Sequence, residues 1–320
     1  LLGLLIGDAL GVPYEFHVPE AIPSAEAIEF VPPAGFSRAH PGVAPGTWSD
    51  DGAQALCLLA SLLHCCRLEP QDFGNRLVNW YEHGYMAVDH EVFDVGAQTG
   101  RALRAIRDGA VATEAGPRSE GDNGNGSLMR VLPLALWHRG TDAQLLHDAA
   151  LQSRVTHGHR RAELCCALYC LWARRILEEH PEPWTSAVTA LRQHCPDDEE
   201  EIAEHLRPDD EPGGAGSGYV VDTLDSARWA CTRTEYEAAV KAYRKLGTYD
   251  GRRSAFPTWL YTIVYNTCLD HLRARARRSE VDIATVAEPA TEVDPAQRHA
   301  DADALDAALR DLPPDQAAAV

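Results

Sequence analysis

Ser49, Asp50 and Asp51 are the residues with the clearest potential for chemistry in this chain, because a hydroxyl and two carboxylates follow one another directly. Together they offer three hard oxygen ligands. Without neighbouring cysteine or histidine pairs, such ligands favour Mg²⁺, Mn²⁺ or Ca²⁺ over zinc. A serine followed by two acids is also typical of a helix start, where serine caps the first turn and acids interact favourably with the helix dipole. Taken alone, the segment favours the helix cap, and only its surroundings can favour the metal site.

Other polar residues stand where a packed core would not require them. Asp8 and Glu15 lie around a glycine-permitted turn, Asp94 directly precedes an amphipathic stretch, and His157 stands at a predicted helix start. The Gly-rich loop 121–127 leads into a helix, so its backbone N–H groups could hold phosphate oxygens. Simpler interpretations exist for each: a helix cap for Asp94, a flexible loop for 121–127, and a surface or capping side chain for His157.

The pattern of apolar residues predicts an all-α fold for the first 240 residues, since these residues recur every three or four positions. No stretch alternates cleanly enough to predict a sheet. The predicted helices cover residues 50–66, 70–83, 96–108, 127–138, 142–152, 159–179, 184–194 and 218–230. Loops rich in glycine, proline and polar residues separate them at 31–48, 109–127, 153–159 and 208–218.

The net charge of −19 is unevenly distributed. Residues 1–240 hold 18 arginines, no lysine and 36 acids, whereas 241–278 hold nine basic residues and two acids, and 279–320 hold two and ten. An acidic body with one basic island predicts two parts with different partners. The acidic run 197–201 is interpreted as a solvated helix face or loop. The nine cysteines show no CxxC spacing, which predicts buried thiols and a cytoplasmic location, and no apolar run is long enough to predict a membrane span.

Six ordered motifs resemble those of the ADP-ribosylglycohydrolase family, the relatives of the dinitrogenase-reductase-activating glycohydrolase. They are Gly7–Glu15, Ser49–Asp51, Asp94–Thr99, Gly124–Arg130, Thr156–His157 and Ser217–Leu224. The resemblance implies a compact, orthogonal, all-α helical bundle with a cleft for one or two Mg²⁺ ions. It also implies hydrolysis of ADP-ribose from a modified protein side chain, with an ADP-ribosylated protein or ADP-ribose as the partner.

The resemblance also implies roles for individual residues. Ser49, Asp50 and Asp51 are expected to be metal ligands, and Glu15 and Asp94 to be catalytic carboxylates beside the scissile ribose. The sequence does not divide the acid and base roles between these two. The residues expected to line the substrate cleft are Asn125, Gly126, Ser127, Met129 and His157, with Tyr219 as a stacking wall.

The chain departs from the family pattern at two places. A Gly-Gly-Asp-Thr-Asp-Thr type sequence, the family's second metal motif, should follow the segment 236–240, but the chain reads Lys-Leu-Gly-Thr-Tyr-Asp-Gly-Arg-Arg at 245–253. Gly52 stands where a threonine is usual after the two acids. A site with about half of its ligands should bind at most one ion, so we expect impaired hydrolase activity.

The basic segment 241–278 resembles region 2 of extracytoplasmic-function sigma factors, with Thr248–Gly251 followed by an amphipathic helix that starts near Phe256. The resemblance implies binding to core RNA polymerase and promoter DNA, whereas composition alone favours an ordinary helix with a buried apolar face and solvated arginines. The residues expected to bind polymerase or DNA are Trp259, Asn266, Asp270, Arg273, Arg275 and Arg277.

The chain is therefore predicted to contain a hydrolase-like domain over 1–240 and a small, helical, sigma-factor-like part. In that part, 241–278 carries the basic helices, 279–300 is an acidic linker, and 301–320 resembles a truncated start of sigma region 4. Three hypotheses follow: an impaired ADP-ribosylglycohydrolase, a transcription initiation protein whose front domain senses ADP-ribose, and a non-functional chimera. The chimera is favoured by a junction that interrupts a metal motif rather than a linker.

Overall fold

A computed structural model of the chain describes residues 1–17, 21–23, 29–213 and 216–231. The sigma-like part lies outside these residues, and so do the acidic linker and the segment 245–253. The predictions made for those segments, including the six polymerase- or DNA-binding residues from Trp259 to Arg277, concern positions that the structure does not describe.

The described residues form a helical fold, which confirms the all-α prediction. The main helices are α1 (Leu2–Gly11), α2 (Asp50–Cys65), α3 (Pro70–His83), α4 (Ala97–Arg107), α5 (Ala112–Ala115), α6 (Leu132–Trp137), α7 (Asp142–Arg154), α8 (Arg160–Leu177), α9 (Pro183–His194) and α11 (Val220–Cys231). The acidic run contributes α10 (Glu199–Glu201), which a π-helical turn over 202–206 follows. Gly124 and Tyr219 form an isolated antiparallel β-bridge in the described part of the chain.

Local sequence explains where several helices begin and end. α3 and α9 each start with a proline, whose fixed φ suits the first helical turn. α3 ends at Gly84, which adopts a left-handed φ of 66°. α7 starts with a capping box between Thr141 and Gln144. These signals place the observed helix ends close to the predicted ones.

Three elements differ from the prediction. α5 lies within 109–127, which was predicted as a loop. α6 begins at Leu132 rather than at 127, because Asn125 to Val131 form successive turns, with the Leu128 N–H donating to the Asn125 carbonyl (2.8 Å). α1 was not predicted, since its three glycines reduce helix propensity. Burial of Leu4, Leu5 and Leu10 stabilises it in the folded chain.

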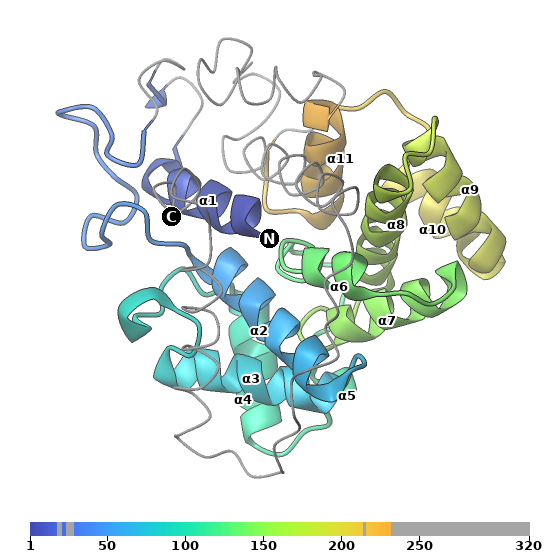
Figure 1. The fold of residues 1–320 in the computed structure, drawn as a ribbon, viewed down its shortest axis with the longest axis horizontal. Coiled ribbons are helices and arrows are strands. Elements are labelled where there is room, and N and C mark those ends of the chain that lie inside the picture. The colour runs from blue at the N-terminus through green and yellow to red at the C-terminus, as the bar shows by residue number, and fades with distance from the viewer. Residues whose placement is uncertain (18–20, 24–28, 214–215, 232–320) are drawn as a thin grey trace, which may run out of the picture. The chain divides into compact units, whose positions relative to one another are not determined.

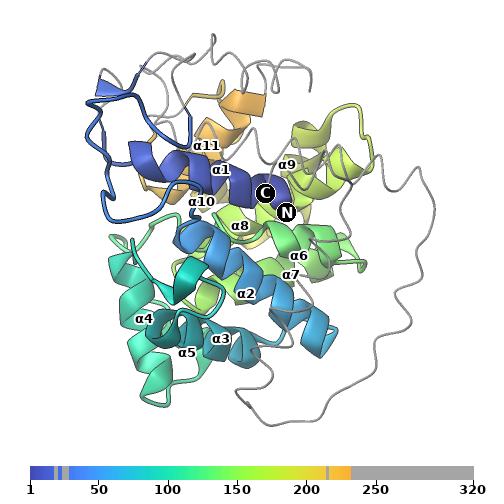
Figure 2. The ribbon, with the colours of Figure 1, turned by 60° about the vertical axis from the view of Figure 1, so that its left-hand side comes forward.

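The helices form two groups that α6 and α7 connect (Figures 1 and 2). α2 packs on α3, and α3 packs on α4 and α5; α8 packs on α9 and α11. α6 contacts both α2 and α8, while α7 contacts α3, α5 and α8. α1 lies against α2, which brings the first helix of the chain to the start of the helix that carries Asp50 and Asp51.

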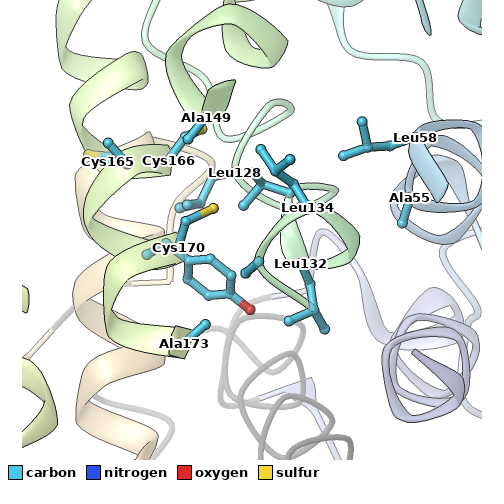
Figure 3. Close-up of a cluster of buried hydrophobic side chains, with 14 of the residues drawn as sticks. Ala55, Leu58, Leu128, Leu132, Leu134, Ala149, Cys165, Cys166, Cys170 and Ala173 are labelled. Carbon is cyan, nitrogen blue, oxygen red and sulfur yellow. The ribbon is translucent and has the colours of Figure 1, made fainter. Parts of the chain in front are cut away.

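The hydrophobic core lies where α2, α6, α7 and α8 meet, as Figure 3 shows. Leu58 from α2 faces Leu132 and Leu134 of α6, with Cys166 and Cys170 of α8 in the same cluster. The cysteines within the described residues are free. Cys57, Cys165, Cys166 and Cys170 are buried as predicted, whereas Cys66 is exposed and the remaining three are partly exposed. No described helix has the length and apolar character needed to cross a membrane.

Candidate functional site

An aspartate from another helix caps the N-terminus of α2. Asp8, in α1, accepts hydrogen bonds from the backbone N–H groups of Ser49 (2.9 Å) and Gly52 (2.7 Å) and from the Ser49 hydroxyl (2.7 Å). Ser49 occupies the N-cap position, but its own side chain makes no capping bond. A helix N-terminus favours an anionic partner. Asp8 therefore supplies the cap, and the donating Ser49 hydroxyl keeps oxygen lone pairs for another ligand.

Gly52 permits this close contact between α1 and α2. A Cβ atom on Gly52 would lie 2.8 Å from Leu5 Cδ2 and 2.9 Å from Asp8 Oδ2, both closer than real Cβ atoms approach other heavy atoms. The threonine expected from the family pattern would require the side chains of Leu5 and Asp8 to shift. The absence of a side chain at Gly52 thus leaves room for the Asp8 carboxylate that caps α2.

Asp50 and Asp51 lie in the first turn of α2, and both line a cavity of the described chain. Asp50 is buried and Asp51 half-buried. Burial raises the pKa of both carboxyl groups well above the usual range of an aspartate. The next largest cause is a neighbouring negative charge: that of Asp51 raises the pKa of Asp50, and that of Asp8 raises the pKa of Asp51. Buried acids so close together are stable when a proton or a cation removes their mutual repulsion.

Glu15 and Asp94 converge on the same region with His40. The Nε2 atom of His40 lies 2.7 Å from Oε2 of Glu15, and the metal-binding atoms of the three residues all lie within 4.8 Å of one another. Burial, followed by the charges of Asp94, Asp8 and Asp51, raises the pKa of Glu15 to about 9. The carboxyl group of Glu15 thus lies beside an imidazole, that of His40, which the sequence alone did not point to.

The backbone of Asp94 adopts the left-handed conformation, as do seven other non-glycine residues of the described chain. Its φ is +51°, in the left-handed region that aspartate tolerates better than most residues. Gly96 follows as the N-cap of α4. Asp94 thus precedes α4 as predicted, but it is not the cap of that helix.

The Gly-rich loop is held in place by bonds to other parts of the chain. The Gly124 N–H donates to Gln98 Oε1 (2.9 Å), and the Asn125 N–H donates to the Gly218 carbonyl (2.9 Å). These two N–H groups are already used within the protein. Of the loop residues that line the cavity, Gly126 is therefore the one whose N–H group could hold a phosphate.

The Ser127 side chain lies beneath the cavity wall. Its hydroxyl accepts a hydrogen bond from Ser153 Oγ (2.8 Å) and lies 3.4 Å from Cys166 Sγ. The residue is fully buried. Ser127 thus supports the loop from below, and its hydroxyl does not line the cavity.

His157 closes the opposite side of the loop. A Cβ atom on Gly126 would lie 2.8 Å from His157 Cε1, so the imidazole requires glycine at that position. The Nδ1 atom lies 2.8 Å from Thr156 Oγ1. Burial, and secondarily the charge of Arg130, lowers the pKa of His157 to about 3. The ring is therefore neutral at physiological pH.

Tyr219 joins α11 to the Gly-rich loop through its backbone. It forms the antiparallel bridge with Gly124, and the next N–H, of Val220, donates to the Asn123 carbonyl (2.9 Å). Its hydroxyl accepts a hydrogen bond from Arg161 Nη1 (3.2 Å). The aromatic ring predicted as a stacking wall thus points toward Arg161, while neighbouring residues of the same segment face the cavity.

A cavity of about 610 Å³ collects these groups between α1, the starts of α2 and α4, and the start of α11. The predicted residues that line it are Glu15, Asp50, Asp51, Asp94, Asn125, Gly126, Met129 and His157. Ser49, Ser127 and Tyr219 lie beside it. Lining residues not selected from the sequence include Gln98, Thr99 and Thr223. Among the described residues that line the cavity there is no lysine or arginine, whereas five carry carboxyl groups.

Comparison with known proteins identifies both parts of the chain. The ADP-ribosylglycohydrolase family model matches residues 1–248, and the Sigma-70 region 2 model matches residues 236–278. The chain is 32% identical over 238 residues to the ADP-ribosylarginine hydrolase Tri1 of Pseudomonas putida, a match that covers 72% of this chain and 59% of that protein. The chain thus spans about three-fifths of the length of the curated relatives it matches first.

Two further similarities agree with this division. A solved structure titled ADP-ribosylglycohydrolase-related protein complex matches with a TM-score of 0.59 and 27% identity, over 83% of this chain and 84% of that chain. The RNA polymerase sigma-H factor of Pseudomonas aeruginosa is 60% identical over 42 residues, 13% of this chain and 21% of that protein. Both resemblances inferred from the sequence are confirmed.

Proposed function

Because the chain belongs to the ADP-ribosylglycohydrolase family, we propose that it hydrolyses the bond between ADP-ribose and a protein side chain. The observation that carries this proposal is the convergence of five carboxyl groups on one cavity of about 610 Å³. Cleavage at the anomeric carbon develops positive charge on the ribose, and nearby carboxylates stabilise such charge. Glu15 and Asp94 are the acids we assign to that position.

We assign the binding of a divalent cation, Mg²⁺ by family resemblance, to Ser49, Asp50 and Asp51. The donor set fits, because all three offer hard oxygens and the two acids are crowded and buried. When bound, such an ion neutralises phosphate charge and activates water. The protein's own contribution is to hold these oxygens in place, through the Asp8 cap on α2 and the hydrogen bond from Gln54 to Asp50.

The five carboxyl groups that line the cavity also bear on the choice of acceptor side chain. The relative from Pseudomonas putida is named an ADP-ribosylarginine hydrolase. A guanidinium leaving group is cationic, so the carboxyl groups that line the cavity attract it. We therefore propose arginine as the modified side chain.

We further propose that turnover is impaired, because the stretch 245–253 replaces the family's second metal motif with one aspartate and a pair of arginines. The proposed activity is tested by measuring ADP-ribose release from ADP-ribosyl-arginine in a magnesium titration. We expect slow, magnesium-dependent release that Asp51→Asn and Glu15→Gln each reduce by at least about tenfold, a barrier increase of about 1.4 kcal/mol.

Asp197→Asn serves as a control, because this acid is exposed, lies in the short helical turn Pro196–Asp198 after α9, and does not line the cavity. Release that is insensitive to both cavity substitutions would refute the site. A rate equal to that of an intact relative, measured in parallel, would refute the impairment.

A second candidate function is supported by the Sigma-70 region 2 match at 236–278. In this alternative the front domain senses ADP-ribose and the basic segment binds core RNA polymerase and promoter DNA. The test is polymerase binding by the full chain, with and without ADP-ribose. Binding that ADP-ribose changes would support the sensor, whereas a chain that binds neither ADP-ribose nor polymerase would support a non-functional chimera.

A further inference from the structure

A connected set of buried polar side chains lies beneath the cavity, with Arg130 at its centre. The residue is fully buried. Its guanidinium donates from Nη1 to Gln54 Oε1 (2.8 Å), from Nη2 to the Gln152 carbonyl (3.0 Å) and from Nε to Gln152 Oε1 (3.3 Å). Its face lies 5.0 Å from the centre of the Phe73 ring. Among the described residues, this buried cation is thus bonded to neutral amides instead of to a carboxylate.

The charge of Arg130 determines how both glutamine amides are oriented. Each amide has an oxygen that accepts and an NH₂ group that donates, so the oxygen must face the guanidinium. The NH₂ group of Gln54 then donates to Asp50 Oδ2 (3.1 Å), and that of Gln152 donates to the Ser127 carbonyl (3.2 Å). One cation therefore directs one donor to a carboxyl group that lines the cavity, and another to the loop whose residues Asn125 and Gly126 line it.

We propose that Arg130 is a positioning residue that, through Gln54 and Gln152, sets the orientation of the Asp50 carboxylate and of the Gly-rich loop at Ser127 together. The inference rests on the proposed function. It adds the side chains that fix the Asp50 carboxylate and the Gly-rich loop relative to each other. Asp50 lines the cavity directly. The other arm ends at Ser127, which follows the lining residues Asn125 and Gly126.

The contacts of the second arm show why the loop depends on it. Ser153 Oγ donates to Ser127 Oγ (2.8 Å) and also contacts the His157 carbonyl (2.9 Å). Ser153 follows Gln152 in α7, so two adjacent residues hold the backbone and the side chain of Ser127. Gln54 lies one helical turn after Asp50 in α2 and holds the other wall. Arg130 is the group common to both.

Three variants separate the arms. Gln54→Leu removes the donor to Asp50, so we expect Mn²⁺ affinity to fall about fivefold while ADP-ribose affinity at saturating Mn²⁺ stays within about twofold. Gln152→Leu removes the donor to the loop, so we expect the reverse. Arg130→Met releases both amides, so we expect both affinities to fall. Mn²⁺ binding is measured by electron paramagnetic resonance, and ADP-ribose binding by calorimetry.

A purely structural role would give a different pattern. Leu191→Ala, in the core of α9, destabilises the fold away from the network and should leave both affinities unchanged. If Arg130→Met lowered only the melting temperature, as Leu191→Ala should, the positioning role would be overturned. Equal losses of both affinities in Gln54→Leu and Gln152→Leu would overturn the division into two arms.

A measurement without ligand distinguishes this inference from the proposed function. The side-chain amide resonances of the two glutamines can be assigned by NMR from their loss in Gln54→Leu and Gln152→Leu. In Arg130→Met both resonance pairs should shift and exchange faster with water, and unchanged resonances would overturn the network itself. A native chain that bound neither Mn²⁺ nor ADP-ribose would overturn the proposed function, and the resonances would still decide the role of Arg130.

Discussion

Burial of the His157 imidazole predicts a specific loss of stability at acid pH. The folded-state pKa is lowered to about 3 from an ordinary value of 6.5, because the ring is buried and secondarily because Arg130 lies nearby. Below pH 6.5 the unfolded chain takes up a proton at this residue, whereas the folded chain does not until about pH 3. The contribution of His157 is therefore present in full above pH 6.5 and is lost as the pH falls toward 3.

The magnitude follows from the linkage relation. Each pH unit between the two pKa values changes the free energy of unfolding by about 1.4 kcal/mol, so the loss at pH 5 amounts to roughly 2 kcal/mol. His157→Asn removes this titration. Between pH 7.5 and pH 5, the native chain should lose about 2 kcal/mol more than His157→Asn does, whatever the variant costs at neutral pH.

The measurement is urea unfolding at a series of pH values, followed by tryptophan fluorescence. Buried Trp80 and Trp229 report the loss of packing. His194→Asn is the matched control, because His194 is exposed at the end of α9 and lies outside the cavity. Parallel stability curves for the native chain and His157→Asn would refute the burial of a neutral imidazole.

Three other predictions concern packing and charge. Leu58→Ala should lower the free energy of unfolding by about 2–5 kcal/mol because Leu58 is fully buried, whereas Leu63→Ala on the exposed side of the same helix should cost under about 0.5 kcal/mol in the same denaturation experiment. Gly52→Ala should cost about 1–3 kcal/mol because the side chains of Leu5 and Asp8 must shift to admit the new methyl group, and Gly121→Ala, whose Cβ would meet open space, is the calorimetric comparison. Mg²⁺ should raise the melting temperature more at pH 8.5 than at pH 5.5, because a cation must displace protons from carboxyls of raised pKa; Asp51→Asn should abolish most of that difference, and an equal rise at both pH values would contradict the assignment.

Helices with a regular apolar pattern could be predicted from the sequence because their signals are local. α8 is an example: Leu164, Leu168 and Leu171 recur at helical spacing and are buried. α1 could not be predicted in this way. Its glycines lower its intrinsic propensity, and its stability comes from packing against α2, which lies some forty residues further along the chain.

In the candidate site, too, some residues could be predicted from local sequence and others could not. Motif residues such as Asp50 and Asp94 are recognisable because their types and spacing recur in a known family. Their partners are not. His40 meets Glu15 across 25 positions, and Gln54 meets Arg130 across 76. No periodicity or spacing rule connects residues so far apart, and only the fold brings them together.

The cavity is built from both ends of the described chain, and this has a consequence for how the protein is synthesised. Asp8 in α1 forms one wall, and Thr223 in α11 forms another, with the bridge between Gly124 and Tyr219 tying α11 to the loop. A ribosome adds about 5–20 residues per second, so α1 emerges roughly 10–40 s before α11 does. During that interval the Gly-rich loop has been synthesised, but Tyr219, which pairs with Gly124, has not. A chain interrupted before residue 216 would lack the lining residues from Gly216 to Thr223, so the cavity can be complete only after α11 has been synthesised.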